Sequence, residues 1–443
     1  MRLLKSLVII TLYVWLPILA KISVDPDSIN KVHLIVSNHL DVGFTNFSAT
    51  VVNTYFDKYF AKARKAGEEL AFENITYSWT THSYLASLYL DCPPNMGLHC
   101  PNETERQAFE SSVSESYIVF HGFPFNSQIE FYDESMFEFG LQLNRDTLNA
   151  LHIPLDKQSI VISQRDVPGI TKSVIPLLLQ YNITAISLGT NDRSPPPAVP
   201  NNIFKWVSYN LSMLTIVHPG GYGGYDHLRD AVLIPGFDQA LTYFYRGICT
   251  YIYIYKEQNR NIWNCSGTIN IQQQQQQQQQ QIQGDNAGPP DAIEVLNATW
   301  YLKGLFPNAE IVCSTYNDYV NALYAANEAM NGSLLDSLPT VTNEEMGDTW
   351  SYGASADPWK MAVFRIAMRH RSTYLENEEG SMYFYNFSRL LLKNGEHTFG
   401  GSTSRFLQNT TYQAWSNAQL QQVLNQSDVI NFVNTWYEQR DWG

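Results

Sequence analysis

The segment His39-Leu-Asp41 has residue types and spacing suited to binding a metal ion. It follows the apolar stretch 32–36, which is rich in β-branched residues and typical of a buried strand. Because residues i and i+2 of an extended chain point to the same side, the imidazole and the carboxylate would converge just beyond the strand. Such a nitrogen–oxygen pair is typical of divalent metal sites, those of zinc above all. The alternative is a histidine and an aspartate that only cap the next element.

Further stretches carry residues that could complete such a site. They contain Asp166 in Arg-Asp-Val-Pro-Gly, Asp285 in Gly-Asp-Asn-Ala-Gly-Pro, Asp348 in Met-Gly-Asp-Thr-Trp, and His397 in Glu-His-Thr-Phe-Gly. Two histidines and two aspartates make a mixed nitrogen and oxygen shell with open positions for substrate hydroxyls. One carboxylate could then act as a nucleophile, while a second, protonated carboxyl group donates its proton to a departing oxygen.

Four residues are candidate substrate contacts. Trp79 and His218 stand at or just beyond the ends of predicted strands, and Asp348 with Trp350 could line a sugar site. For His218 the alternative is a structural histidine whose hydrogen bonds are satisfied within the fold. For Asp348 the alternative is a role in stabilising its own loop.

These motifs, in this order, resemble those of glycoside hydrolase family 38, the α-mannosidases, and more closely an uncharacterised subgroup of that clan. The resemblance extends from about residue 30 to about residue 405. It implies that zinc is held by His39, Asp41, Asp166 and His397. It also implies that Asp166 is the catalytic nucleophile and Asp285 the acid/base, with Asp348 as the other candidate for the acid role.

The resemblance implies a seven-stranded β/α barrel followed by a three-helix bundle. This chain departs from the family pattern in two places. Family members often have a histidine where Ile170 stands, and they continue into large β-sandwich domains where this sequence ends at Gly443. We therefore expect the C-terminal β-domains to be missing.

The elements that position these residues are predicted to be successive β/α units. Ser48 or Thr45 could cap a helix whose apolar residues follow the helical period, and Gly67 is placed to end it. Apolar strands followed by polar or glycine-rich breaks recur about every thirty to forty residues. In β/α barrels the chemistry lies on the loops at the carboxyl ends of the strands. The pattern predicts an α/β fold with a barrel over 30–330.

The pattern changes to long helices over 335–443, where Trp359, Val363 and Ile366 share one helical face. We expect these helices to form a bundle beside the barrel. Within the barrel region, Gln272 to Gln281 is an unbroken glutamine tract. It builds no apolar face, so we expect a disordered surface insertion over about 266–283.

The N-terminal region and the cysteines suggest a secreted protein. Arg2 and Lys5 precede a largely apolar run that is short for a membrane span, which predicts a signal peptide over 1–20. Many Asn-x-Ser/Thr sequences suit a glycosylated surface. Two cysteine pairs, Cys92 with Cys100 and Cys249 with Cys265, are placed for local disulfides, and Cys313 is left over. We expect a secreted, lysosomal or endomembrane-lumen protein without a membrane span once the signal peptide is removed.

Composition narrows the classes of partner. The net charge of −14 argues against nucleic acid and anionic membranes. An aromatic content of 13% suits carbohydrate binding, because sugar faces stack on aromatic rings. The first hypothesis is therefore a secreted, zinc-dependent, retaining α-mannosidase-like glycoside hydrolase. The alternatives are a metal-dependent carbohydrate deacetylase, in which the metal activates water, and a glycan-binding protein without turnover.

Overall fold

The computed structural model describes most of the chain. The described residues are 24–167, 169–190, 197–199, 202–218, 231–245, 285–347, 355, 357–378, 380–401 and 416–442. Five sequence predictions lie outside them: the signal peptide, the glutamine tract, the Cys249–Cys265 disulfide, and the positions of Asp348 and Trp350.

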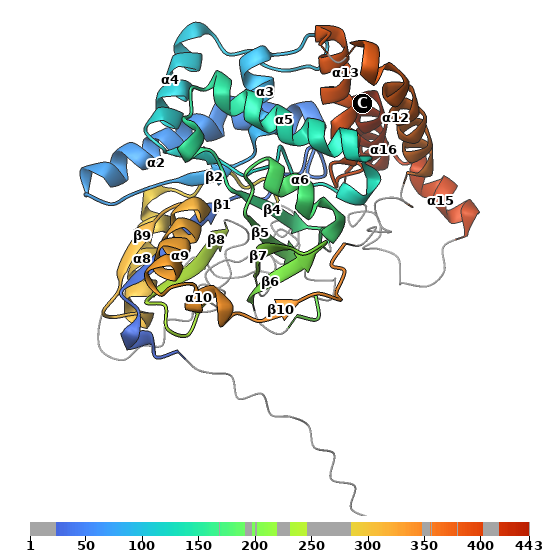
Figure 1. The fold of residues 1–443 in the computed structure, drawn as a ribbon. Coiled ribbons are helices and arrows are strands. Elements are labelled where there is room, and N and C mark those ends of the chain that lie inside the picture. The colour runs from blue at the N-terminus through green and yellow to red at the C-terminus, as the bar shows by residue number, and fades with distance from the viewer. Residues whose placement is uncertain are drawn as a thin grey trace, which may run out of the picture.

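The described strands form two five-stranded sheets (Figure 1). The first has the order β3-β2-β1-β8, with β9 also paired to β1, and all of its pairings are parallel. The second has the order β10-β6-β7-β5-β4, and only its β6–β7 pair is antiparallel. The first sheet contains β1 (Lys31–Ser37), β2 (Trp79–Thr81), β3 (Ile118–Phe120), β8 (Gln239–Tyr245) and β9 (Glu310–Cys313). The second contains β4 (Val161–Asp166), β5 (Ala185–Thr190), β6 (Ile203–Ser208), β7 (Leu211–Val217) and β10 (Thr340–Val341).

The two sheets approach each other where β3 ends and β4 begins. The backbone N–H of Gly122, just past β3, donates to the carbonyl oxygen of Val161 in β4 over 2.9 Å. Among the described strands, pairing does not close the sheets into a ring, so the predicted seven-stranded barrel is not shown. The mixed α/β class and the mainly parallel sheets agree with the prediction.

Helices connect and cover the strands (Figure 1). They are α1 (Ser48–Thr54), α2 (Phe60–Phe72), α3 (Ser83–Asp91), α4 (Glu103–Ser114), α5 (Glu134–Ala150), α6 (Ile175–Gln180), α8 (Ala292–Leu305), α9 (Tyr316–Ala329) and α10 (Ser333–Asp336). The predicted first helix begins at Ser48 and continues through a π-helical turn, Tyr55–Tyr59, into α2. Its N-cap position is held by Phe47, so neither Ser48 nor Thr45 caps it as predicted. Gly67 does not end it. A Cβ atom there would come within 2.4 Å of the Tyr117 ring, so this glycine allows close packing inside the helix.

The C-terminal region is helical beyond β10. It contains α12 (Pro358–Glu378), α13 (Met382–Leu392), α15 (Asn417–Leu424) and α16 (Ser427–Asp441), of which α12, α13 and α16 lie together in Figure 1. The predicted apolar face of α12 is exposed, with Trp359 at 58%. The buried side of that helix instead carries Lys360, Phe364 and Arg371. The predicted boundary between barrel and bundle stays a prediction.

Two further findings concern cysteines and hydropathy. Cys92 and Cys100 form the predicted disulfide, and Cys313 is a buried free thiol. None of the helices in the described part of the chain is long and apolar enough to cross a bilayer.

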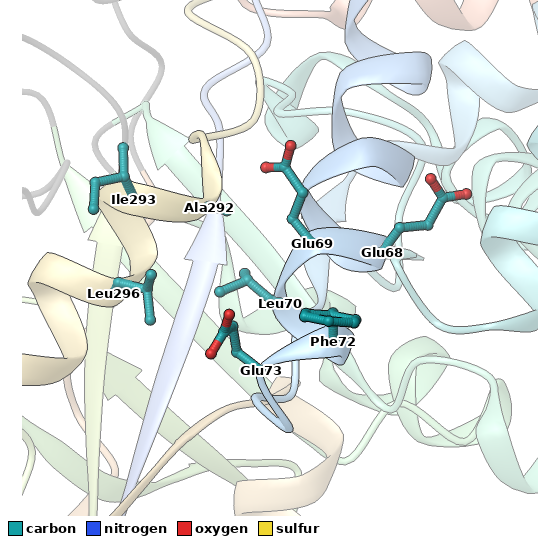
Figure 2. A pocket seen from close by; sticks show the side chains of 8 residues that line it. All are labelled: Glu68, Glu69, Leu70, Phe72, Glu73, Ala292, Ile293 and Leu296. Carbon is teal, nitrogen blue, oxygen red and sulfur yellow. The ribbon is translucent and has the colours of Figure 1, made fainter.

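A groove of about 550 Å³ lies between the end of α2 and the start of α8 (Figure 2). Its walls mix acidic and apolar side chains, among them Glu69, Glu73, Phe72 and Ile293. None of the predicted metal ligands lines it, so the chemistry predicted from the sequence does not belong to this groove.

Candidate metal centre

The loop after β1 brings His39 and Asp41 together as the sequence predicts. Nε2 of His39 lies 2.9 Å from Oδ1 of Asp41, and both residues are buried. The strand itself ends earlier, at Ser37, so the two side chains converge from the loop that follows it. Gly43, two residues further on, has φ +125°, a backbone angle that favours glycine. It lets the chain turn sharply away from the site toward α1.

Asp166 is the last residue of β4, and its side chain points to the same place. Its Oδ2 lies 3.9 Å from Nε2 of His39 and 3.3 Å from Nε2 of His397. Its φ of +75° lies in the left-handed region, which is unusual for a non-glycine residue and costs free energy. Strained backbone of this kind clusters at active sites and ligand-binding positions.

The fourth residue, His397, comes from the C-terminal helical region. Its segment pairs with the loop after β3 through an antiparallel bridge between Ser127 and Glu396. The backbone N–H of Gln128 also donates to the carbonyl oxygen of Gly395 over 2.9 Å. As a result, Nε2 of His397 lies 2.8 Å from Oδ1 of Asp41 and 3.1 Å from Nε2 of His39.

The four side chains could hold a metal ion. One ligand atom from each of His39, Asp41, Asp166 and His397 lies within 4.8 Å of all the others, and all four residues are buried. Two imidazole nitrogens and two carboxylate oxygens form one of the ligand sets that zinc takes in proteins. The second carboxylate oxygen of Asp41, Oδ2, is buried without a hydrogen-bond partner, and the charge of a bound cation would offset the cost of that burial.

The electrostatics of the cluster also favour a bound cation. Burial alone would lower the pKa of His39 and of His397. At His39 the negative charge and hydrogen bond of Asp41 outweigh this effect of burial, so the pKa is raised. At His397 the carboxylates of Glu396, Asp166 and Asp41 have the same effect, and the pKa is raised as well. Burial would raise the pKa values of Asp41 and Asp166, but the two histidines hold both below the ordinary range. The carboxylates therefore stay ionised, and the protons that the imidazoles attract can be replaced by a metal ion.

Asp285 lies beside this cluster. Its carboxyl pKa is raised from 3.8 to about 8, first by burial and then by the charge of Asp41, to which Asp166 adds. Its neighbour Asn286 fixes the segment in place. The Asn286 side-chain oxygen accepts the backbone N–H of Asp41 over 2.9 Å, and its backbone N–H donates to the carbonyl oxygen of His39 over 3.2 Å. The raised pKa favours the protonated form of Asp285 at neutral pH, whereas Asp41 and Asp166 stay ionised.

Two of the predicted substrate contacts, Trp79 and His218, lie among the described residues, and both are buried. Trp79 is fully buried, and its indole packs near the rings of Tyr55 and Phe60 rather than facing an open site. Sequence position alone could not show this, because the side chains of a strand alternate between two faces. His218 follows β7, is buried, and has its Nε2 3.1 Å from the hydroxyl of Tyr316. That partner matches the structural alternative, and a role of His218 in binding substrate stays a prediction.

Sequence reasoning missed two residues that support the cluster. Oε1 of Glu396 lies 2.9 Å from Nδ1 of His397, the ring nitrogen that faces away from the cluster. Metal-binding histidines commonly have such a carboxylate behind them. The position of Glu396 directly before His397 in the sequence could have indicated this role. Asn126, which contacts both histidines, gave no signal of its own.

Comparisons with known proteins support the fold. The structure resembles an α-mannosidase from Enterococcus faecalis V583 with a TM-score of 0.53 at 11% sequence identity. The match covers 93% of this chain and 41% of the α-mannosidase, so this chain spans about two fifths of that protein's length. A glycosyl hydrolase family 38 protein from Enterococcus faecalis follows at a TM-score of 0.46 and 10% identity, covering 93% of this chain and 39% of that protein. This second likeness is too distant to add to the argument.

Sequence comparisons are less informative. Residues 354–443 match a domain of unknown function, DUF5054. That part of the chain includes His397. No curated protein sequence matches this chain. The likeness to the α-mannosidase is therefore one of fold alone.

Proposed function

We propose that this chain is a zinc-dependent, retaining glycoside hydrolase that acts on α-mannoside-like glycans. The observation that carries the proposal is the buried group His39, Asp41, Asp166 and His397, with the protonated acid Asp285 beside it. Ionised and protonated carboxyl groups in one site are the two partners that a retaining glycosidase needs. The likeness to an α-mannosidase fold supports the choice of sugar.

In this proposal Asp166 is the nucleophile. Its lowered pKa keeps the carboxylate ionised, and its backbone conformation directs the side chain into the cluster. A bound zinc ion would hold sugar hydroxyls in its open coordination positions and stabilise the distorted ring. The Asp166 carboxylate then attacks the anomeric carbon and forms a glycosyl ester as the bond to the leaving oxygen breaks.

Asp285 is the acid and then the base. Its proton passes to the departing oxygen in the first step, which leaves the carboxylate form. In the second step that carboxylate takes a proton from water, the water oxygen bonds to the anomeric carbon, and Asp166 is released. Asp348 lies outside the described residues, and the raised pKa of Asp285 favours Asp285 for this role.

The test uses the zinc-loaded full chain with a panel of aryl α-glycosides. We expect free mannose from an α-mannoside, and proton NMR should show the α-anomer appearing first. Asp166→Asn should abolish turnover and weaken metal binding together, because one carboxylate serves both roles. The control is Asp133→Asn. Asp133 caps α5 and accepts a hydrogen bond from Ser372, it is not one of the four clustered residues, and asparagine caps helices equally well.

Other results of these assays would support one of the alternative functions. Release of acetate from acetylated sugars, without glycoside cleavage, would show a deacetylase. Glycan binding without either reaction would show a binding protein. A first product of inverted configuration would remove Asp166 as the nucleophile.

We also propose that the chain is secreted or enters an endomembrane lumen. The disulfide between Cys92 and Cys100 supports an oxidising compartment. Expression in a eukaryotic host should give a protein in the medium that loses mass on deglycosylation and begins near residue 21. Retention in the cytosol with an intact N-terminus would refute this.

A further inference from the structure

The segment 126–128 is the place where three ligand-bearing parts of the chain meet. All three of its residues are buried. Ser127 pairs with Glu396, and its backbone N–H donates to Oε1 of Gln164 in β4 over 2.9 Å. The segment therefore joins the end of β4 to the loop that carries His397.

Asn126 makes the contacts nearest the metal ligands. Its backbone oxygen accepts from Nδ1 of His397 over 3.2 Å and from the backbone N–H of the same residue over 3.3 Å. Its side-chain oxygen accepts the backbone N–H of Arg165 over 3.0 Å, one residue before Asp166. Its side-chain nitrogen lies 3.2 Å from Nδ1 of His39. One residue thus contacts both histidine ligands and the end of the strand that carries Asp166.

We propose that Asn126 is a positioning residue of the metal centre. Its side-chain amide holds the His39 ring so that Nε2 faces Asp41. The same amide binds the backbone of Arg165 and so fixes the end of β4, where Asp166 follows. The proposal rests on the metal site of the proposed function, but it does not depend on glycoside cleavage. Groups that bind the far nitrogen of a metal-binding histidine set the orientation of the ring and the affinity of the site.

The side-chain amide of Asn126 has too few hydrogen-bond acceptors for all the donors around it. When Nε2 of His39 binds a metal ion, Nδ1 carries the proton and needs an acceptor. An asparagine amide has one oxygen, and turning the amide over exchanges its oxygen with its nitrogen. Asn126 can therefore accept from His39 or from the backbone N–H of Arg165, but not from both at full strength. An aspartate of the same shape could accept from both.

The experiment measures zinc affinity of the full chain by competition with a chelator, for wild type, Asn126→Ala and Asn126→Asp. We expect Asn126→Ala to bind zinc about 10–100-fold more weakly, the loss typical when such a supporting partner is removed. Asn126→Asp should bind at least as tightly as wild type. The matched control is Asn144→Ala, which removes a buried asparagine on α5 whose side chain bonds Ser83 and no metal ligand.

Two further readouts separate positioning from folding. The melting temperature of each metal-free variant shows whether the alanine changes destabilise the protein equally. The visible absorption of the cobalt-substituted protein reports ligand geometry, and it should change in Asn126→Ala and not in Asn144→Ala. If Asn126→Ala does not fold, Asn126→Asp and its cobalt spectrum still carry the test.

The proposal is overturned if Asn126→Ala binds zinc as tightly as wild type, or if Asn144→Ala weakens zinc binding equally. Much weaker binding in Asn126→Asp than in wild type would overturn it as well, and so would a wild-type protein that binds no divalent metal. A wild-type protein that binds zinc tightly but cleaves no glycoside would refute the proposed function and leave the role of Asn126 standing.

Discussion

The raised pKa of Asp285 predicts how activity should depend on pH. A carboxyl group with a pKa of about 8 is about nine-tenths protonated at pH 7 and about one-tenth protonated at pH 9. With its ordinary pKa, fewer than about one molecule in a thousand would carry the proton at pH 7. Burial is the largest cause of the shift, and a bound cation does not remove it. Asp285 should therefore remain a usable acid at neutral pH in the zinc-loaded protein.

The assay follows kcat/KM for an aryl α-mannoside with a poor leaving group between pH 4 and pH 10. We expect the rate to fall on the alkaline side with an apparent pKa at or somewhat below 8, because zinc offsets part of the charge of Asp41 and Asp166. Asp285→Asn should lower the rate by roughly 10²–10⁴-fold and remove this alkaline fall. The loss should be smaller for a dinitrophenyl leaving group, which needs no proton.

Stability gives an independent check on the same group. The folded-state pKa is raised, so Asp285 contributes stability that is complete below about pH 4 and is lost as pH rises through about 8. The free energy of unfolding of the metal-free wild type should therefore fall relative to that of Asp285→Asn across this range. An Asp285→Asn variant that kept both the alkaline fall in rate and the wild-type dependence of stability on pH would refute the reasoning.

Three other predictions test the metal centre, the packing and the insertion. His397→Ala should lose most bound zinc because it removes one of the four ligands; elemental analysis after dialysis checks this, and wild-type zinc content would contradict it. Gly140→Ala should lower the unfolding free energy by about 1–3 kcal/mol, because a Cβ there meets the buried Phe123 ring at 2.6 Å. Its control, Gly304→Ala, meets nothing within 4 Å and should be neutral or slightly stabilising in the same denaturant titration. Deleting Gln272 to Gln281 should change neither melting temperature nor metal content, since surface loops change length at small entropic cost; a large loss of either would show that the tract is packed.

Much of the candidate site could be predicted from the sequence. The His-x-Asp spacing predicted that His39 and Asp41 lie together, and the structure confirms that contact, although both residues belong to the loop after β1 and not to the strand. Asp166 was predicted at a strand end, and it is the last residue of β4. These predictions succeed because they depend on local geometry, which the residue types and their spacing determine.

Other features depend on packing between distant segments. His397 reaches Asp41, more than three hundred residues away, only because its loop pairs with the segment after β3. The protonated state of Asp285 follows from burial beside two carboxylates, which no local pattern records. Trp79 was predicted to contact substrate but is buried against helices, because the sequence cannot say which face of a strand meets a helix.

The physical reason is the range of the interactions involved. Strand alternation, helix capping and turn chemistry act over a few residues, so the sequence alone determines the α/β pattern and the His-x-Asp pair. The burial of a carboxyl group and the face that a helix turns inward depend on side chains contributed by other parts of the chain. On α12 the predicted apolar face is exposed and Lys360 is buried, with its ammonium group against the Phe399 ring and the carbonyl oxygen of Thr398, which another part of the chain contributes. Tertiary structure alone decided that arrangement, and with it the support of His397 by Glu396.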